Sequence, residues 1–284
     1  MPTILNAIIN IAKFKNNNLK QYSSTYLNRI NAVGELLEFY IKDSISGSFT
    51  KKQEDRELEY SKVFSYLGNQ NNPPDLIIKG GDAFEIKKIE GKNRVIALNS
   101  SYPKDKLYIS DQRITGACRN CEIKEWKEKD FFYIVGQVKK GILNNIIIVQ
   151  GICYCANPEI YKKLYDPLKE EIDLILSTGG FEKGKTTELG KVKKIDPLGI
   201  TDLRIRGMWD IQNPFKVFST ILQHDEAKEF SLYTIMTKEK YSSFSNENKK
   251  DLENQKSINI KDVKIKNPNN PAKLIDAKLI TFSF

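Results

Sequence analysis

The sequence has 284 residues but contains one histidine, two tryptophans and four cysteines. The single histidine, His224, argues against catalytic triads and metal sites that need imidazole ligands, and we interpret it as an ordinary surface or packing residue. The most apolar stretch is "NNIIIVQGICYC", residues 144–155. This stretch is far too short to cross a membrane, so no membrane partner is expected.

The amino-terminal segment lacks the charge order of a secretory signal. In "MPTILNAIINIAKFK" the lysines follow the apolar residues instead of preceding them. This order favours an amphipathic helix, and we expect a cytoplasmic protein.

The few cysteines form two close pairs, Cys118 and Cys121 in "CRNC" and Cys153 and Cys155 in "CYC". Two neighbouring pairs resemble the ligand set of a structural zinc site. However, a zinc ribbon repeats Cys-x-x-Cys, whereas Cys-x-Cys on a strand directs both thiols to one face. Ordinary reduced cysteines are therefore the favoured interpretation, with structural zinc as the alternative.

Charge is the first positive indication of function. Lys and Arg number 45 against 36 Asp and Glu, which gives a net charge of +9 and a pI of about 9.1. A basic excess favours a polyanionic partner, usually nucleic acid. The alternative is a solvated, lysine-rich surface, and a biased genome would also produce this Asn-, Lys- and Ile-rich composition.

The order of apolar patterns predicts an α/β protein of the α+β kind, without internal repeats. Residues 1–65 are predicted to be helical, and "YLNRINAVGELLEFYIKDSIS" (26–46) has apolar residues at helical spacing. Residues 66–155 are predicted to form a sheet core. Its expected strands are "DLIIK", "AFEIKKI", "RVIALN", "DFFYIVGQV" and "NNIIIVQGICYC", with a helical stretch around 110–126 and a turn at "KKGILNN".

The carboxyl-terminal part, residues 156–284, is predicted to begin with a helix over 158–178 that is broken or kinked near Pro167. A polar, loop-rich region follows it, and strands are expected near the end of the chain. We expect the whole of 1–284 to form one domain.

One hairpin, "NPPDLIIKGGDAFEIKK" (72–88), collects charged residues on a strand otherwise suited to burial. Side chains alternate along a strand, so Glu85 and Lys87 share a face. A two-residue turn at Gly80-Gly81 would pair residue 75 with 86 and turn Asp75 away. A three-residue loop over 80–82 with a bulge would pair residue 75 with 87 and bring the three side chains together.

If the three side chains converge, they have the equipment for phosphodiester hydrolysis. Carboxylates are the oxygen ligands that Mg²⁺ prefers, and a lysine orients a nucleophile and stabilises developing negative charge. Glu38, in "GELLE" on the predicted helix, is a further candidate for the same metal. The alternatives are a chance polar strand face and, for Glu38, a solvated helix charge.

A second motif, "GGFEKGKT" (179–186), satisfies the P-loop pattern. A P-loop is followed by a helix whose amino terminus binds phosphate. The segment that follows this motif is a poor helix former, because it contains Gly190 and ends at Pro197. We therefore expect no nucleotide cofactor. A basic, glycine-rich loop that touches a DNA backbone is the substitute interpretation.

Longer phrases carry a family resemblance. "FSYLGNQNNPPDLIIKGGDAFEIKKIE", "ALNSSYPKDKLY", "DPLGIT" and "LRIRGMWDIQNPF" together resemble the NgoPII-type family of type II restriction endonucleases, up to about residue 218. The resemblance implies a restriction-endonuclease-like PD-(D/E)xK core, a mixed β-sheet flanked by helices. It also implies Mg²⁺-dependent cleavage of double-stranded DNA at GGCC, leaving 5′-phosphate and 3′-hydroxyl ends.

The resemblance also implies roles for individual residues. Asp75 and Glu85 would be metal ligands and Lys87 the catalytic lysine. Catalysis would belong to residues 66–155 and DNA recognition to 156–284. The candidates for DNA contact are Arg204, Arg206, Asn99, Ser100, Ser101 and Lys104.

Each DNA-contact candidate has a structural alternative: the arginines would pair with Asp202 or Asp210, and the serines would cap a helix. A palindromic target implies a homodimer in which each subunit cuts one strand. Three other functions stay open: a repair or junction nuclease that reads DNA shape, a non-enzymatic DNA-binding protein, and a P-loop NTPase.

Overall fold

The computed structural model describes residues 2–25, 33–69, 71–91, 94–186, 188–223 and 227–284. His224 and the part of the predicted helix over 26–32 lie outside the described residues. The helices are α1 (Ile4–Phe14), α2 (Lys20–Thr25), α3 (Val33–Ser46), α4 (Gln53–Val63), α5 (Gly116–Arg119), α6 (Gly151–Tyr154), α7 (Pro158–Thr178), α8 (Pro214–Val217), α9 (Lys238–Ser243) and α10 (Asn246–Glu253).

The strands alternate with these helices along the chain. They are β1 (Phe64–Asn69), β2 (Asn72–Ile78), β3 (Ala83–Ile89), β4 (Ile96–Asn99), β5 (Lys106–Tyr108), β6 (Glu128–Lys139), β7 (Ile142–Gln150), β8 (Glu182–Lys183), β9 (Gly190–Lys193), β10 (Leu203–Ile205), β11 (Trp209–Ile211), β12 (Ser231–Thr237), β13 (Ile258–Asn267) and β14 (Asn270–Ser283).

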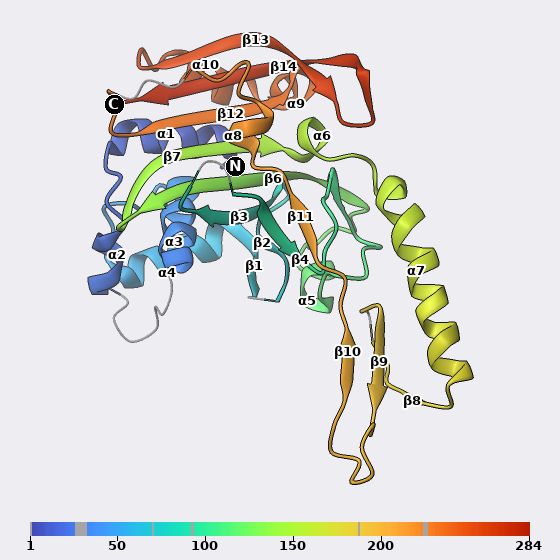
Figure 1. The fold of residues 1–284 in the computed structure, drawn as a ribbon. Coiled ribbons are helices and arrows are strands. Elements are labelled where there is room, and N and C mark those ends of the chain that lie inside the picture. The colour runs from blue at the N-terminus through green and yellow to red at the C-terminus, as the bar shows by residue number, and fades with distance from the viewer. Residues whose placement is uncertain (1, 26–32, 70, 92–93, 187, 224–226) are drawn as a thin grey trace.

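The main sheet has the strand order β1-β2-β3-β6-β7-β12-β14-β13, with β5 beside β6 (Figure 1). The pairs β3–β6 and β7–β12 are parallel and the others are antiparallel, so the sheet is mixed. The predicted fold class, a mixed sheet flanked by helices, is confirmed. The sheet also extends beyond residues 66–155, because β12, β13 and β14 complete it.

Side-chain alternation on the central strands builds a hydrophobic core on each face of the sheet. On β6, Phe132 and Ile134 belong to one core and Phe131 and Tyr133 to the other. Helices α1, α3, α4 and α10 cover the first face, while β4, α5 and α6 cover the second. The hairpin β2–β3 lies between these two layers, next to β6.

The amino-terminal helix forms for local reasons that the sequence shows. Thr3 and Asn6 make a reciprocal capping box at the start of α1. Ile4, Ile8 and Ile11 recur at helical spacing and are fully buried. The predicted amphipathic helix is confirmed.

Three local expectations are wrong. Residues 151–154 form α6 instead of continuing the preceding strand, and the helical stretch expected around 110–126 shrinks to α5. The α7 helix continues through Pro167, where the chain is exposed to solvent. Proline there removes one backbone hydrogen bond, which water replaces at an exposed position, so the helix does not need to end.

An arm made of α7 and the small sheet β10-β9-β8 extends away from the main sheet (Figure 1). The P-loop-like residues lie in this arm: Gly179 ends α7, and β8 follows. A P-loop needs a strand before its glycines and a helix after them, and here the order is reversed. None of the helices in the described ranges is long and apolar enough to span a bilayer.

Candidate active site

The β2–β3 hairpin determines which charged side chains meet. Leu76 lies opposite Phe84 and Ile77 opposite Ala83, and this ladder places residue 75 opposite 85. Ile78 donates to the carbonyl of Asp82, which leaves a three-residue loop over 79–81. The expected pairing of 75 with 87 is therefore wrong by two residues, because the loop is centred on Gly80, which adopts a φ of +61°.

A shift of two residues keeps the same face, so Asp75, Glu85 and Lys87 still converge. The Lys87 ammonium lies 2.6 Å from Glu85 Oε1. Asp75 Oδ2 accepts a 2.5 Å hydrogen bond from the backbone N–H of Ile86. All three side chains line one pocket, together with Asn99 and Ser100.

Burial and mutual repulsion shape the protonation of this cluster. Burial, followed by the charge of Glu85, raises the pKa of Asp75 well above its ordinary value, against the opposing effect of Lys87. Burial by itself lowers the pKa of Lys87, but Glu85 and Asp75 outweigh it and hold that pKa above its ordinary value. Lys87 therefore stays an ammonium group in this arrangement.

Glu38 on α3 is close enough to influence the cluster. Burial raises the pKa of Glu38, while Lys42 and Lys87 oppose the rise. Lys42 is also its ion-pair partner, at 3.7 Å. The charge of Glu38 in turn contributes to the raised pKa of Asp75. The sequence candidate thus lies at the edge of the carboxylate cluster.

The carboxylates fit a divalent cation. Glu85 Oε2 is buried and has no hydrogen-bond partner among the described residues, which is costly for a carboxylate unless a cation or water completes it. Mg²⁺ takes few protein ligands and fills its other positions with water and phosphate oxygens. No group of three or more His, Cys, Asp or Glu side chains in the described ranges is arranged to hold a metal on its own.

The four cysteines do not form a metal-binding group in the part of the chain that the structure covers. All four are free thiols, and Cys118, Cys153 and Cys155 are buried. The expected strand geometry also fails, because Cys153 lies in α6 and Cys155 ends that helix.

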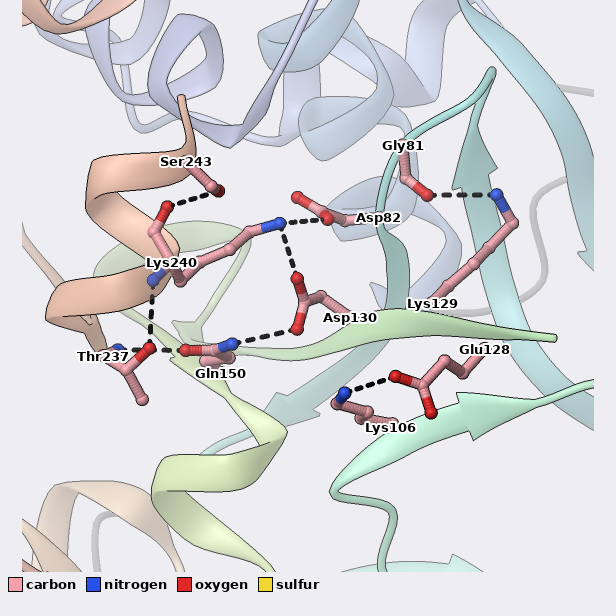
Figure 2. Close-up of polar contacts among 10 residues, drawn as sticks. All are labelled: Gly81, Asp82, Lys106, Glu128, Lys129, Asp130, Gln150, Thr237, Lys240 and Ser243. Carbon is pink, nitrogen blue, oxygen red and sulfur yellow. Dashed lines mark hydrogen bonds and ion pairs between the residues drawn. The ribbon is translucent and has the colours of Figure 1, made fainter. Parts of the chain in front are cut away.

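A buried ionic network fixes one side of the hairpin loop (Figure 2). The ammonium group of Lys240, on α9, contacts the carboxylates of Asp82 and Asp130. Gln150 donates to Asp130 at 3.0 Å and accepts from the backbone of Thr237 at 2.9 Å. The start of β3 is thereby tied to β6, β7 and β12.

A second network fixes the other side of the loop. Lys129 donates to the carbonyl of Gly81 at 3.1 Å and pairs with Glu122 at 2.8 Å. Glu122 also accepts from the backbone N–H of Gly80 at 3.0 Å. The loop that determines the register of Asp75 against Glu85 is thus held from both sides.

Gly68 on β1 is a positioning residue that sequence reasoning missed. A Cβ added at Gly68 would lie 2.3 Å from the carbonyl oxygen of Pro74 and 2.9 Å from Cα of Asp75. Only glycine lets β1 approach the Pro-Pro-Asp segment this closely. A glycine just before the proline motif was the available signal.

The segment after β4 supplies polar groups to the same pocket. Asn99 ends β4 with a φ of +54°, and Ser100 and Ser101 follow it. The Ser101 hydroxyl is buried and, within the described chain, has no hydrogen-bond partner. Asn99, Ser100 and Ser101 all line the pocket that contains Glu85.

Lys104 does not fit its predicted role. Its side chain is 3% exposed, its ammonium pairs with Asp111, and it lies 4.9 Å from the ring centroid of Tyr102. A buried, paired ammonium is not placed to meet a phosphate, so Lys104 supports the loop instead of contacting DNA. The sequence position beside the serines suggested exposure that the fold does not provide.

The two arginine candidates lie together on the arm, as expected from their spacing. Arg204 and Arg206 contact the same carboxylate, Glu188, at 2.6 and 2.8 Å, while 57% and 51% of their side chains remain exposed. Arg204, with burial opposing it, holds the pKa of Glu188 below its ordinary value. The structural alternative named Asp202 or Asp210 as their partner, but both arginines contact Glu188, and Asp202 pairs with Lys191.

Arg113 is a second residue that the sequence did not reveal. It lines the active-site pocket and also a cavity of about 400 Å³ bounded by α7. Its guanidinium donates to the hydroxyl of Tyr165 on α7 at 2.9 Å, and its carbonyl accepts from Asn72 at 2.8 Å. Arg113 therefore connects the candidate active site with the arm.

Two carboxylates and a lysine on adjacent strands of a mixed sheet have the layout of a restriction-endonuclease-like protein. The family model described as NgoPII restriction endonuclease matches residues 2–266. The chain is also 47% identical over 280 residues to the type II restriction enzyme NgoPII of Neisseria gonorrhoeae, covering 98% of this chain and 99% of that protein. The chain belongs to the NgoPII restriction endonuclease family. No solved structure matches it.

Proposed function

We propose that this protein is a Mg²⁺-dependent type II restriction endonuclease that hydrolyses double-stranded DNA at a short palindromic site, GGCC, leaving 5′-phosphate and 3′-hydroxyl ends. Membership of the family supports site-specific DNA cleavage. The observation that carries the proposal is the meeting of Asp75, Glu85 and Lys87 in one pocket. A restriction enzyme of this kind acts on DNA in the cytoplasm.

Each residue of the cluster has a task in this chemistry. Asp75 and Glu85 would hold the metal, with Glu38 as an outer carboxylate. The bound metal would polarise the phosphate and lower the pKa of a water molecule. Lys87 donates hydrogen bonds and positive charge, which suits it to orient the attacking water and to stabilise charge on the phosphate. The raised pKa of Lys87 favours its ammonium form, which suits these two roles.

DNA contact is assigned to both the pocket and the arm. Asn99, Ser100 and Ser101 border the carboxylates and are suited to phosphate or sugar contacts. Arg204 and Arg206 are more than half exposed and held in place by Glu188, which suits bidentate contact with guanine. The net charge of +9 supports attraction to the phosphate backbone.

We further propose that residues 1–284 act as one nuclease domain and that two copies act on a palindrome, each cutting one strand. The hairpin and the segment after β4 line the candidate site, and α7 of the arm lines the neighbouring cavity that shares Ser100 and Arg113 with it. Two-fold symmetry of the target would then match the two-fold symmetry of a dimer.

The test is a cleavage assay on a labelled duplex with one GGCC site and on a matched duplex with GCGC. Wild-type protein should cut only the first, and only with Mg²⁺. Lys87→Ala should reduce the rate by about 10²–10⁴-fold, as loss of a group that stabilises the transition state does. Lys88→Ala is the matched control, because Lys88 pairs with exposed Glu90 at 2.8 Å outside the pocket.

The outcomes separate the other functions. Cutting at branched or mismatched DNA without sequence preference would indicate a repair nuclease. DNA binding without cleavage under any metal would sink the enzyme proposal and leave a DNA-binding protein. Equal activity of the Lys87→Ala and Lys88→Ala variants would show that the assignment of the active site to Lys87 and its neighbours is wrong.

A further inference from the structure

Arg113 differs from the other cationic side chain of the active-site pocket in having no ion-pair partner. Among the described residues, Lys87 and Arg113 are the two cations that line this pocket. Lys87 is paired with Glu85 at 2.6 Å. The Arg113 guanidinium instead donates to a neutral group, the hydroxyl of Tyr165, at 2.9 Å, and makes no ion pair with a carboxylate of the described chain. The pocket therefore contains a positive charge that its own residues do not balance.

The carboxylates near Arg113 are bonded to other cations. Asp111 pairs with buried Lys104 and accepts from the backbone N–H of Arg113, at 2.8 Å, not from its side chain. Glu188 contacts the two arginines of the arm. Those arginines are the main cause of the lowered pKa of Glu188, and the charge of Arg113 adds to the effect from a greater distance. Because a guanidinium is always charged, this half-buried one is suited to an anion that the chain itself does not supply.

The guanidinium is held in place without being neutralised. Tyr165 lies on α7, and its ring packs against the arm, because a Cβ added at Gly207 would lie 3.4 Å from that ring. The backbone carbonyl of Arg113 accepts from the side chain of Asn72 at 2.8 Å, three residues before Asp75. Tyr165 uses one guanidinium nitrogen, which leaves the N–H groups of the other two to donate to two oxygens of one anion.

We infer that Arg113 is a catalytic residue that binds the phosphate group being cleaved, and that Tyr165 is a positioning residue that holds the guanidinium for this contact. The inference rests on the proposed function and adds a residue to the three assigned there. The active-site pocket has a volume of about 60 Å³, room for several water molecules, which suits one phosphate group and not a nucleotide. A phosphate group in this pocket is within reach of Asp75, Glu85, Lys87 and Arg113 together.

The chemistry uses a charge of this kind. Hydrolysis that leaves a 5′-phosphate forms a bond from a water oxygen to phosphorus and breaks the bond from phosphorus to the 3′ oxygen, which takes up a proton. Negative charge develops on the phosphate oxygens during this exchange. Arg113 offers parallel N–H donors and a full positive charge to those oxygens, whereas the charge of Lys87 is shared with Glu85. Groups of this kind typically contribute about 10²–10³-fold to the rate.

The first test is single-turnover cleavage of a GGCC duplex at saturating protein with Mg²⁺. Arg113→Ala should lower the rate about 10²–10³-fold, and Arg113→Lys, which keeps the charge but loses the planar fork, about tenfold. Lys162→Ala is the matched control, because Lys162 lines the adjacent cavity but not the pocket. Rates of both Arg113 variants equal to that of Lys162→Ala would overturn the inference.

Chemical rescue separates substrate contact from a structural role. Guanidinium chloride at about 50 mM lowers protein stability only slightly. It should raise the rate of Arg113→Ala at least about tenfold by occupying the vacated position, and it should leave Lys87→Ala unchanged. An Arg113→Ala protein that guanidinium does not restore would argue that the arginine acts by supporting its loop.

A double-mutant cycle tests the role of Tyr165. Tyr165→Phe removes the acceptor of the guanidinium and should lower the rate about tenfold in the wild type, but not in the Arg113→Ala background. Tyr161→Phe is the control on the same helix, because the Tyr161 hydroxyl accepts from the backbone N–H of Ala156 instead. Equal losses from Tyr165→Phe in both backgrounds would show that it does not act through Arg113.

The salt dependence of binding separates this inference from the proposed function. In a Lys87→Ala background, where the duplex stays intact, fluorescence anisotropy gives the slope of log affinity against log salt concentration. Adding Arg113→Ala should reduce that slope by about one, because one phosphate contact is lost, whereas adding Lys162→Ala should not. If the wild type never cuts GGCC, the proposed function fails, and the slope still decides the phosphate contact. An unchanged slope overturns the inference. A reduced slope with an unchanged cleavage rate assigns Arg113 to a different phosphate and overturns its catalytic role.

Discussion

The β2–β3 hairpin and the arm differ in how far their charged side chains are exposed to solvent. Around the hairpin, charged groups are buried: Glu85, Asp82 and Lys240 are each about 10% exposed or less. In the arm, Arg204 and Arg206 remain more than half exposed around one buried carboxylate, Glu188. Buried, mutually bonded charges make a rigid scaffold for chemistry, whereas exposed and oriented charges remain available to a ligand.

This difference predicts different consequences of substitution. Changes around the hairpin should alter stability or the geometry of catalysis, because each buried group has partners that cannot be replaced by water. Changes in the arm should alter DNA affinity and leave folding intact, because water readily solvates what remains.

The largest expected effect is on stability. Lys240→Met leaves Asp82 and Asp130 as neighbouring carboxylates without their shared cation (Figure 2) and should lower the free energy of unfolding by about 3–5 kcal/mol. Lys106→Met removes an exposed pair with Glu128 in the same region and should cost less than about 1 kcal/mol. Urea denaturation measures the free energy of unfolding of both variants. Equal decreases in the two variants would contradict the proposed distinction between buried and exposed charge.

The next effect is on catalytic geometry. Gly68→Ala places a Cβ against the backbone of Pro74 and Asp75, which must then move, so the cleavage rate should fall about 100-fold. Gly91→Ala is the control, because an added Cβ meets no described atom within 4 Å. Single-turnover cleavage at saturating DNA isolates the effect. A Gly68→Ala protein of normal rate would show that the hairpin is less rigid than its contacts indicate.

The arm should affect binding instead. Arg204→Ala should weaken binding to a GGCC duplex by about 10- to 100-fold, as loss of a bidentate base contact does, without changing the melting temperature. Lys191→Ala, directly opposite Arg204 on β9, removes the same charge from the same arm and should have a smaller effect. Fluorescence anisotropy with GGCC and GCGC duplexes distinguishes the two kinds of contact. Loss of a base contact should reduce the ratio of the GGCC affinity to the GCGC affinity, whereas loss of a phosphate contact should lower both affinities equally.

The smallest expected effect is on pH dependence. Burial and the charge of Glu85 raise the pKa of Asp75. Protons therefore compete with Mg²⁺ for the Asp75 carboxylate at pH values above those at which an ordinary aspartate titrates. At subsaturating Mg²⁺ the cleavage rate should rise up to tenfold per pH unit until Asp75 ionises, and this dependence should weaken at saturating Mg²⁺. An identical pH profile at both Mg²⁺ concentrations would argue against Asp75 as the metal ligand.

The same raised pKa has a consequence for stability. The folded protein holds the Asp75 proton more tightly than the unfolded chain, so the stability contribution of this group is present at low pH. It is lost as the pH rises from the unfolded value through the raised folded value. Asp75→Asn, which cannot ionise, should therefore remove this decline in urea denaturation measured across pH.

Local patterns predicted much of the candidate site. Period-two alternation puts Glu85 and Lys87 on one face whatever the turn, so their proximity needs no knowledge of the fold. The register of Asp75 was not predictable, because Gly80 and Gly81 can each take the left-handed position of the loop. The networks of Lys240 and Glu122 that hold the loop involve residues far from the hairpin in sequence.

Patterns failed where burial or distant partners decide. The β12 strand is buried along its whole length and therefore shows no alternation. The apolar run 144–155 contains both a strand and the start of α6, and periodicity alone does not separate them. Lys104 is buried with Asp111 as its ion-pair partner, which its neighbours in sequence do not indicate.

The sequence by itself determined the fold class, the amphipathic first helix, the family and the face that Glu85 and Lys87 share, because each depends on residues within a few turns or strands of one another. Only the tertiary structure decided which carboxylate holds the two arginines, how closely β1 approaches Asp75, and which helix holds Arg113 beside the active-site pocket. These features depend on contacts between residues distant in sequence, and such contacts form only when the sheet and its layers assemble.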